Sequence, residues 1–279
     1  MSTRLQRIWF SLALDESRET ALLHLTALPQ TDQHDEVLFL RTIQISECIF
    51  WGILTSVEAA IETLKHGPLR DAATFLNEAN WFSRLLLPLF QAFKTMPVEH
   101  FRNFREQTGN ASAIQSRTYQ LMQIVCQGVD EKKVEALSKT SEVADLLLCA
   151  HPSFATLRNT LENLESKGMP DLEPVKTEAE ALDHNLYAWR CVHLGIARKY
   201  LADLMSAPNT GIQVGGAWSN NSQSQTTVNA IGTGGTSGPP YLEAHFRHMI
   251  LKQPTHYAPW ALIEIVPQVV ARPILGPMN

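Results

Sequence analysis

The chain has 279 residues, of which 44% are hydrophobic and 18% charged, and its formal net charge at pH 7 is -5. This length and composition suit one large domain covering residues 1–279. Basic residues occur singly or in short groups, whereas phosphate binding needs a basic face, so we expect no nucleic-acid partner. We see no stretch near the roughly 20 apolar residues that span a bilayer and no secretion signal. We therefore expect a cytoplasmic protein with no membrane partner.

Helical periodicity is common along the chain and strand signals are scarce, which predicts an all-α helical bundle. The first strong helix is expected over residues 35–66, with Asp35 as its cap and Gly67 at its end. Its apolar stripe includes Phe39 and Ile43, so both side chains are expected on the buried face.

The other expected helices are shorter or less regular. In chain order they cover 69–94 with an interruption or kink at Pro88, 97–105, 112–127, 131–168 in one or two pieces, 178–205 after a break at Pro174, and 241–251. Between the last two lies a stretch dense in Gly, Ser, Asn, Thr and Gln with no apolar period. We interpret residues 207–238 as a flexible loop that closes over an active site.

The four cysteines lie far apart and form no Cys-x-x-Cys pair and no Cys-x-x-Cys-His heme-attachment motif. We expect them to be reduced thiols in the core. They are Cys48, Cys126, Cys149 and Cys191. Any heme would then be held without a thioether bond.

The sequence Trp189-Arg-Cys-Val-His193 falls inside the long helix expected over 178–205. A neutral imidazole on a helix is a good axial ligand for heme iron, because the helix fixes its direction. The alternative, and the commoner role of a helical histidine beside apolar residues, is a packed and hydrogen-bonded core residue.

Two further segments carry residues suited to binding a small molecule. Arg105, next to Phe101 and Phe104, offers a planar fork that matches a carboxylate; the alternative is a surface arginine. The segment 232–238 holds four glycines, which let the backbone approach a ligand closely. It lacks the Gly-Lys-Ser/Thr ending of a phosphate loop, and a surface linker is its alternative.

Taken in this order, the segments resemble the tryptophan 2,3-dioxygenase family. Three blocks carry the resemblance: Asp35 to Phe39 through Gln44, Ser46 and Glu47; Phe104-Arg105 through Ser112, Gln115 and Ser116; and Trp189-Arg190-x-x-His193 with the loop from Gly232 to Gly238. The resemblance implies an all-helical tetramer that binds heme b without a covalent link. It also implies an oxygenase of a free aromatic L-amino acid, with dioxygen or peroxide as the oxidant.

The resemblance further implies roles for single residues. His193 would be the protein ligand of the heme iron. Substrate-binding roles fall on Phe39, Phe101, Arg105 and Thr233, cofactor-binding roles on Ala113, Trp189, His193 and Gly232, and places on the distal, catalytic side of the heme on Ile43 and Ser112.

The chain also departs from the family pattern. Ile43 stands where the family has a distal histidine, and Phe101 stands where it has a pocket tyrosine. These changes favour a single oxygenation of the indole ring of tryptophan or a derivative. The alternatives are a tryptophan 2,3-dioxygenase that yields N-formylkynurenine, a heme-dependent tyrosine hydroxylase and a non-catalytic heme sensor. Arg105 and Thr233 argue against the sensor, because sensing a gas needs no carboxylate clamp.

Overall fold

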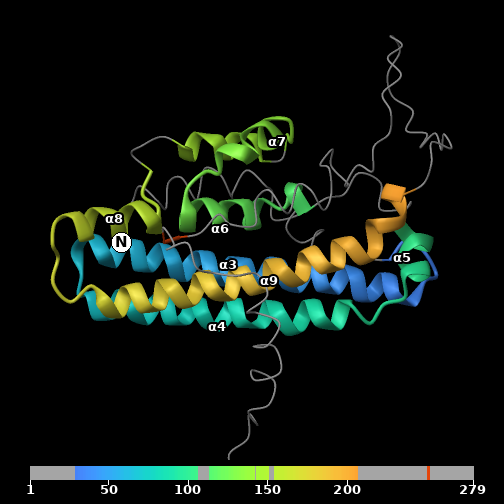
Figure 1. Ribbon diagram of the computed structural model, residues 1–279, viewed down its shortest axis with the longest axis horizontal. Coiled ribbons are helices and arrows are strands. Elements are labelled where there is room, and N and C mark those ends of the chain that lie inside the picture. The colour runs from blue at the N-terminus through green and yellow to red at the C-terminus, as the bar shows by residue number, and fades with distance from the viewer. Residues whose placement is uncertain (1–28, 106–112, 142, 151–153, 207–249, 252–279) are drawn as a thin grey trace, which may run out of the picture.

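The computed structural model describes residues 29–105, 113–141, 143–150, 154–206 and 250–251 (Figure 1). These residues form α-helices and short 3₁₀ helices (η) and contain no strand, so the all-α prediction is confirmed. The elements are α3 (His34–His66), α4 (Leu69–Phe93), α5 (Val98–Arg105), η1 (Ala113–Gln115), α6 (Arg117–Gln127), η2 (Glu131–Lys133), α7 (Val134–Ser138), η3 (Ala144–Ala150), α8 (Leu157–Ser166) and α9 (Glu173–Ser206).

Three long helices form the body of the molecule. α3 packs against α4 and α4 packs against α9, so that the three lie side by side in Figure 1. α6 and α8 cover α3 from the other side, while the short α5 contacts α3 and α9 at one end. At 33 residues, α3 is about 50 Å long. It runs the length of the bundle and contributes to both ends of the core.

The N-terminus of α3 is fixed by Glu36 and not by the expected cap. The Glu36 carboxylate accepts the backbone N–H groups of Gln30 and Thr31, each at 2.8 Å. Asp35 instead faces His100 of α5, with its Oδ2 2.7 Å from Nδ1 of the ring. The prediction that Asp35 caps the helix was therefore wrong. Asp35 ties the start of α3 to α5.

Two helix boundaries differ from the sequence prediction. Ser116 breaks the helix expected over 112–127, because its Oγ accepts the Tyr119 N–H at 3.2 Å and starts α6 afresh. α9 begins at Glu173, so the expected break at Pro174 was also wrong. Proline suits a first helical turn, where the missing N–H has no intrahelical partner. α4, by contrast, runs through Pro88 as one helix.

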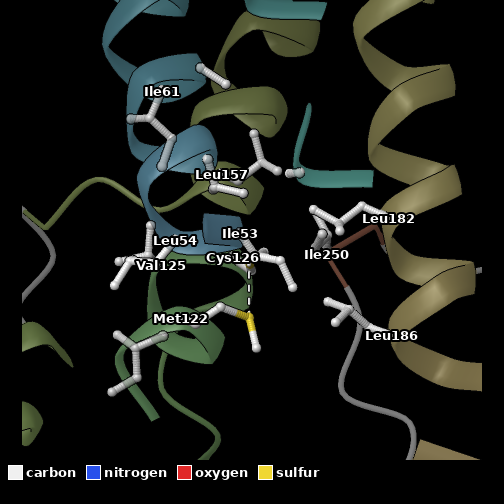
Figure 2. Packing of buried hydrophobic residues seen from close by; sticks show 14 of the residues in the cluster. Ile53, Leu54, Ile61, Met122, Val125, Cys126, Leu157, Leu182, Leu186 and Ile250 are labelled. Atoms are coloured by element: carbon white, nitrogen blue, oxygen red, sulfur yellow. Dashed lines mark hydrogen bonds between the residues drawn. The ribbon is translucent and has the colours of Figure 1, made fainter. Parts of the chain in front are cut away.

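The segment at residues 250–251 enters the main core. Ile250 is fully buried, and Figure 2 shows it facing Leu182 and Leu186 of α9. The Asp183 carboxylate accepts the backbone N–H of Ile250 at 2.7 Å and that of Leu251 at 2.9 Å. Packing and hydrogen bonds together anchor this segment to α9.

Two smaller expectations need correction. All four cysteines are free, but only Cys126 and Cys149 are buried, while Cys48 is exposed and Cys191 is half-buried. α3 is also long and apolar enough, by length and composition alone, to cross a membrane. The expectation that no stretch reaches that length was wrong. In this structure α3 is a core helix packed on α4, α6 and α8.

Candidate active site

An aromatic cluster lies where α3, α4, α5 and α9 meet. Its members are Phe39, Phe93, Phe101, Phe104 and Tyr200. The Phe39 ring centroid is 6.0 Å from that of Phe101 and 5.4 Å from that of Phe104, and Phe101 is 5.0 Å from Tyr200. The structure therefore brings together the two apolar residues that the resemblance assigns to a substrate pocket.

Arg105 ends α5, directly after the fully buried Phe104. Its side chain is half-buried, and desolvation lowers the pKa of its guanidinium, which nevertheless stays charged at neutral pH. Arg102, one turn earlier on the same helix, is exposed. Arg105 thus differs from an ordinary surface arginine and can hold a charge in a partly dry environment.

His193 lies on α9 against two aromatic rings. Its ring stacks on Trp189 and meets Phe90 edge-on, each with centroids 5.5 Å apart. Desolvation, with a smaller contribution from the charge of Lys133, lowers the pKa of His193 to about 4. The imidazole is therefore neutral at pH 7, which is the form that binds iron. No hydrogen bond to this ring occurs within the described ranges, so the side chain fits an axial heme ligand.

Phe90 links His193 to the aromatic cluster. Its ring touches His193 and also packs against the buried members of the cluster. Ile196, less than one turn after His193 on α9, is itself a buried part of that packing. The candidate iron ligand and the candidate substrate wall are therefore neighbours along one end of the bundle.

The first two sequence blocks also meet in space. The Ser116 Oγ donates a short hydrogen bond to the Glu47 carboxylate, joining the start of α6 to the middle of α3. The same Ser116 caps α6, so one residue positions two elements. This contact gives Ser116 and Glu47, which belong to the resemblance but have no expected role in binding, a structural role.

Ile43 lies one turn beyond Phe39 on α3, and its side chain is 44% exposed. The prediction that Ile43 belongs to the buried stripe was therefore wrong. Ala113 opens η1, and its surroundings are not described. Ser112, Gly232 and Thr233 lie outside the described residues, as does the expected loop over 207–238.

Sequence reasoning missed a buried lysine beside His193. Lys133 ends η2, is 6% exposed, and donates from Nζ to the Gln123 side-chain oxygen. It lies within a short charged run that is typical of a surface turn. A usable signal was the spacing of Tyr119, Gln123 and Gln127, which puts three polar side chains on one face of α6.

Comparisons with known proteins decide the family. A family model described as tryptophan 2,3-dioxygenase matches residues 12–182, which is more than half of the chain. The chain belongs to the tryptophan 2,3-dioxygenase family. The matched residues include α3 to α8, and they end before His193.

Individual relatives agree with this assignment. A tryptophan 2,3-dioxygenase of Geobacillus thermodenitrificans is 25% identical over 230 residues, covering 76% of this chain and 79% of the relative. One from a Ruegeria species, strain TM1040, is 30% identical over 139 residues, which span 47% of this chain and half of the relative. One from Bacillus anthracis is 30% identical over 93 residues, a third of each chain. At the level of the family, the expected class of heme-dependent aromatic oxygenases and the expected cofactor, heme b, are confirmed.

Proposed function

We propose that this chain is a heme-dependent oxygenase of a free aromatic L-amino acid, namely tryptophan or a tryptophan derivative, and that it inserts one oxygen atom into the indole ring. The observation that carries the proposal is the pairing of a neutral His193 with an adjacent aromatic wall that ends at Arg105. His193 suits a ligand of the heme iron, and Arg105 suits a partner of the amino-acid carboxylate. In this proposal residues 1–279 form one cytoplasmic domain.

The substrate would be held by its amino-acid end and its ring separately. The Arg105 guanidinium donates two parallel hydrogen bonds to the carboxylate, and partial burial strengthens that pair. Thr233, outside the described residues, would bind the ammonium and carboxylate. Phe39 and Phe101 present an apolar edge to the aromatic ring. Such positioning supplies up to roughly 7–11 kcal/mol of rate acceleration in ideal cases.

His193 would hold the heme iron through its neutral imidazole, with Trp189 stacked behind it to fix the ring. Ala113 and Gly232 would lie against the cofactor. When bound, heme would supply the activation of the oxidant. Hydrogen peroxide balances a single oxygenation by itself, because one oxygen atom enters the ring and the other leaves as water. Dioxygen does so only when an external reductant supplies two electrons, with two protons, to release the second oxygen atom as water. The protein's own task is to keep the substrate ring aligned and to exclude water from it.

Ile43 supports the single oxygenation. Its aliphatic side chain can neither donate a hydrogen bond nor accept a proton, and Phe101 is likewise without a polar atom. With Ile43 near the oxidant, a hydrogen bond to it could come from the Ser112 hydroxyl, outside the described residues, or from the substrate's own ammonium. A substrate that is held less tightly after the first oxygen transfer would be released before a second one.

Two isotope-labelled oxidants test this proposal: labelled hydrogen peroxide alone, and labelled dioxygen with a two-electron reductant. Products from tryptophan and a panel of its derivatives are analysed by mass spectrometry. One labelled atom in an intact or rearranged ring is the expected result. Two labelled atoms in a ring-opened N-formylkynurenine would refute the single oxygenation and leave an oxygenase. No oxygenated product from any aromatic amino acid, tyrosine included, with either labelled oxidant would favour the heme sensor. Ile43→His should shift the product ratio towards ring cleavage.

We also propose that the chain forms a homo-oligomer, a tetramer by resemblance. Large apolar side chains are exposed on neighbouring helices: Trp51 on α3 at 45%, and Trp81 at 65% and Leu85 at 53% on α4. Gly52 of α3 packs directly against the Phe82 ring of α4, so the two helices meet here. Exposed apolar groups gathered in one region are typical of a protein interface.

A further inference from the structure

A cluster of polar side chains lies beside His193, between α6, η2 and α9. We call it the donor cluster: Gln123 and Gln127 of α6, Lys133 of η2, and Trp189 and Arg190 of α9. Every member is between 2% and 7% exposed. Buried polar groups normally find hydrogen-bond partners, so the partners of this cluster can be counted.

Donors outnumber acceptors in the donor cluster. The Gln123 oxygen accepts from Lys133 Nζ, and the Gln127 oxygen accepts from Arg190 Nη2 at 3.1 Å. Both amide oxygens are therefore engaged. The buried Trp189 Nε1 and Gln127 Nε2 donate to no acceptor within the part of the chain that the structure describes. The neighbouring Tyr119 hydroxyl is already hydrogen-bonded to Arg190, so these two buried N–H groups remain without an acceptor among the described residues.

The charges of the donor cluster also favour binding of an anion. Lys133 lies 5.4 Å from the centre of the Tyr119 ring, and its charge and that of Arg190 act on one another. Asp130 acts on Lys133 and Asp183 on Arg190, but both Asp183 oxygens already accept the N–H groups of the segment at 250–251. A buried site with two cations and spare N–H donors suits a carboxylate.

We propose that the donor cluster receives a propionate carboxylate of the heme, with Lys133 as its charged partner and the Trp189 and Gln127 N–H groups as further donors. The inference rests on the proposed function, because it takes His193 as the iron ligand. Trp189 stacks on His193, so the donors begin one helical turn from that ligand. Arg105 directly follows Phe104 of the aromatic cluster, whereas Phe90 packs against that cluster and against His193, so we assign the substrate carboxylate a separate site at Arg105.

The test compares two probes on the full, heme-free chain by absorbance titration: ferric heme, and its dimethyl ester, in which both propionates are neutral. Wild type should bind heme at least tenfold more tightly than the ester. Lys133→Met should lose about tenfold in heme affinity and leave ester affinity unchanged. Lys133→Arg should keep most of the preference. Lys139→Met, an exposed lysine paired with Glu135 on α7, is the matched control and should change neither affinity.

Equal affinity of wild type for the two probes would overturn the inference, and so would an equal loss of both in Lys133→Met. If Lys133→Met does not fold, the Lys133→Arg protein and the wild-type preference decide the question by themselves. A chain that binds neither probe would refute the proposed function together with the inference. A chain that binds both equally, and loses both in His193→Ala, would keep the proposed function and refute the propionate site alone.

Discussion

At the scale of single residues, a substitution of Arg105 distinguishes a substrate-binding arginine from an ordinary surface arginine. Removing one side of a partly buried, charge-assisted pair costs about 2–5 kcal/mol. We expect Arg105→Leu to weaken substrate binding by about 30-fold or more, with heme content unchanged, as measured by substrate titration. Arg102→Leu, one turn earlier on α5 and exposed, is the control and should stay near wild type. A loss of substrate affinity below about threefold in Arg105→Leu would show that Arg105 is an ordinary surface arginine.

Lys133 gives the heme-free protein a pH dependence of known sign. Desolvation, with a smaller contribution from Arg190, lowers the pKa of Lys133 to about 7 in the folded chain, whereas an unfolded lysine titrates near 10.4. Between these values the unfolded chain binds more protons, so this group makes folding more favourable as the pH rises. One pKa unit corresponds to about 1.4 kcal/mol.

We therefore expect the free energy of unfolding of wild type, relative to Lys133→Met, to rise by a few kcal/mol at most between pH 7 and pH 10. Urea unfolding of the two heme-free proteins at several pH values measures this difference, because other titrating groups cancel in the comparison. A difference that stays flat, or that falls over this interval, would mean that Lys133 is solvated in the folded chain.

At the scale of elements, we expect the stability of the fold to depend on the segment at 250–251. Ile250 is fully buried against α9, and truncating such a side chain to alanine typically costs about 2–5 kcal/mol. We expect Ile250→Ala to lose stability in that range in urea unfolding. Leu148→Ala on η3, where the side chain is 76% exposed, should change stability by less than about 0.5 kcal/mol. Equal effects of the two substitutions would show that the anchor is not formed in solution.

Periodicity predicted the long helices well, because one buried face fixes both their type and their extent. α3 and α4 were expected within one residue of their observed ends. The errors came from residues with two possible roles. Pro174 was taken as a break although it suits a first turn, and Asp35 was taken as a cap although it faces His100.

The residues of the candidate site could be proposed from the sequence only through the resemblance to the tryptophan 2,3-dioxygenase family. Phe39 and Phe101 are in contact in the structure, but they lie far apart in the sequence, and only the comparison with a family suggested that they share a site. Lys133 was missed because a charged run usually faces water, and its burial depends on how η2 is folded against α6 and α9. Local pattern carries no information on packing of that kind.

At the scale of the whole molecule, the exposed side chains on α3 and α4 predict self-association. We expect sedimentation or light scattering to give the mass of an oligomer for wild type. A charge at the interface should reduce that mass, so Trp81→Asp combined with Leu85→Asp is expected to yield smaller species that stay folded. Leu148→Asp, at an even more exposed leucine on η3, is the control and should keep the wild-type mass. A monomeric mass for the wild-type protein would refute the proposed homo-oligomer.

The account as a whole depends on one side chain that holds the cofactor. His193 and His184 lie on the same helix, and desolvation lowers the pKa of both. They differ in that the His193 ring, unlike that of His184, makes ring contacts with Phe90 and Trp189 among the described residues. The absorption spectrum of purified protein is the most direct measurement. Wild type and His184→Ala should both show a histidine-ligated heme that shifts on adding an aromatic amino acid. His193→Ala should lose that spectrum with its helical circular dichroism intact, and a heme spectrum unchanged by His193→Ala would contradict the account.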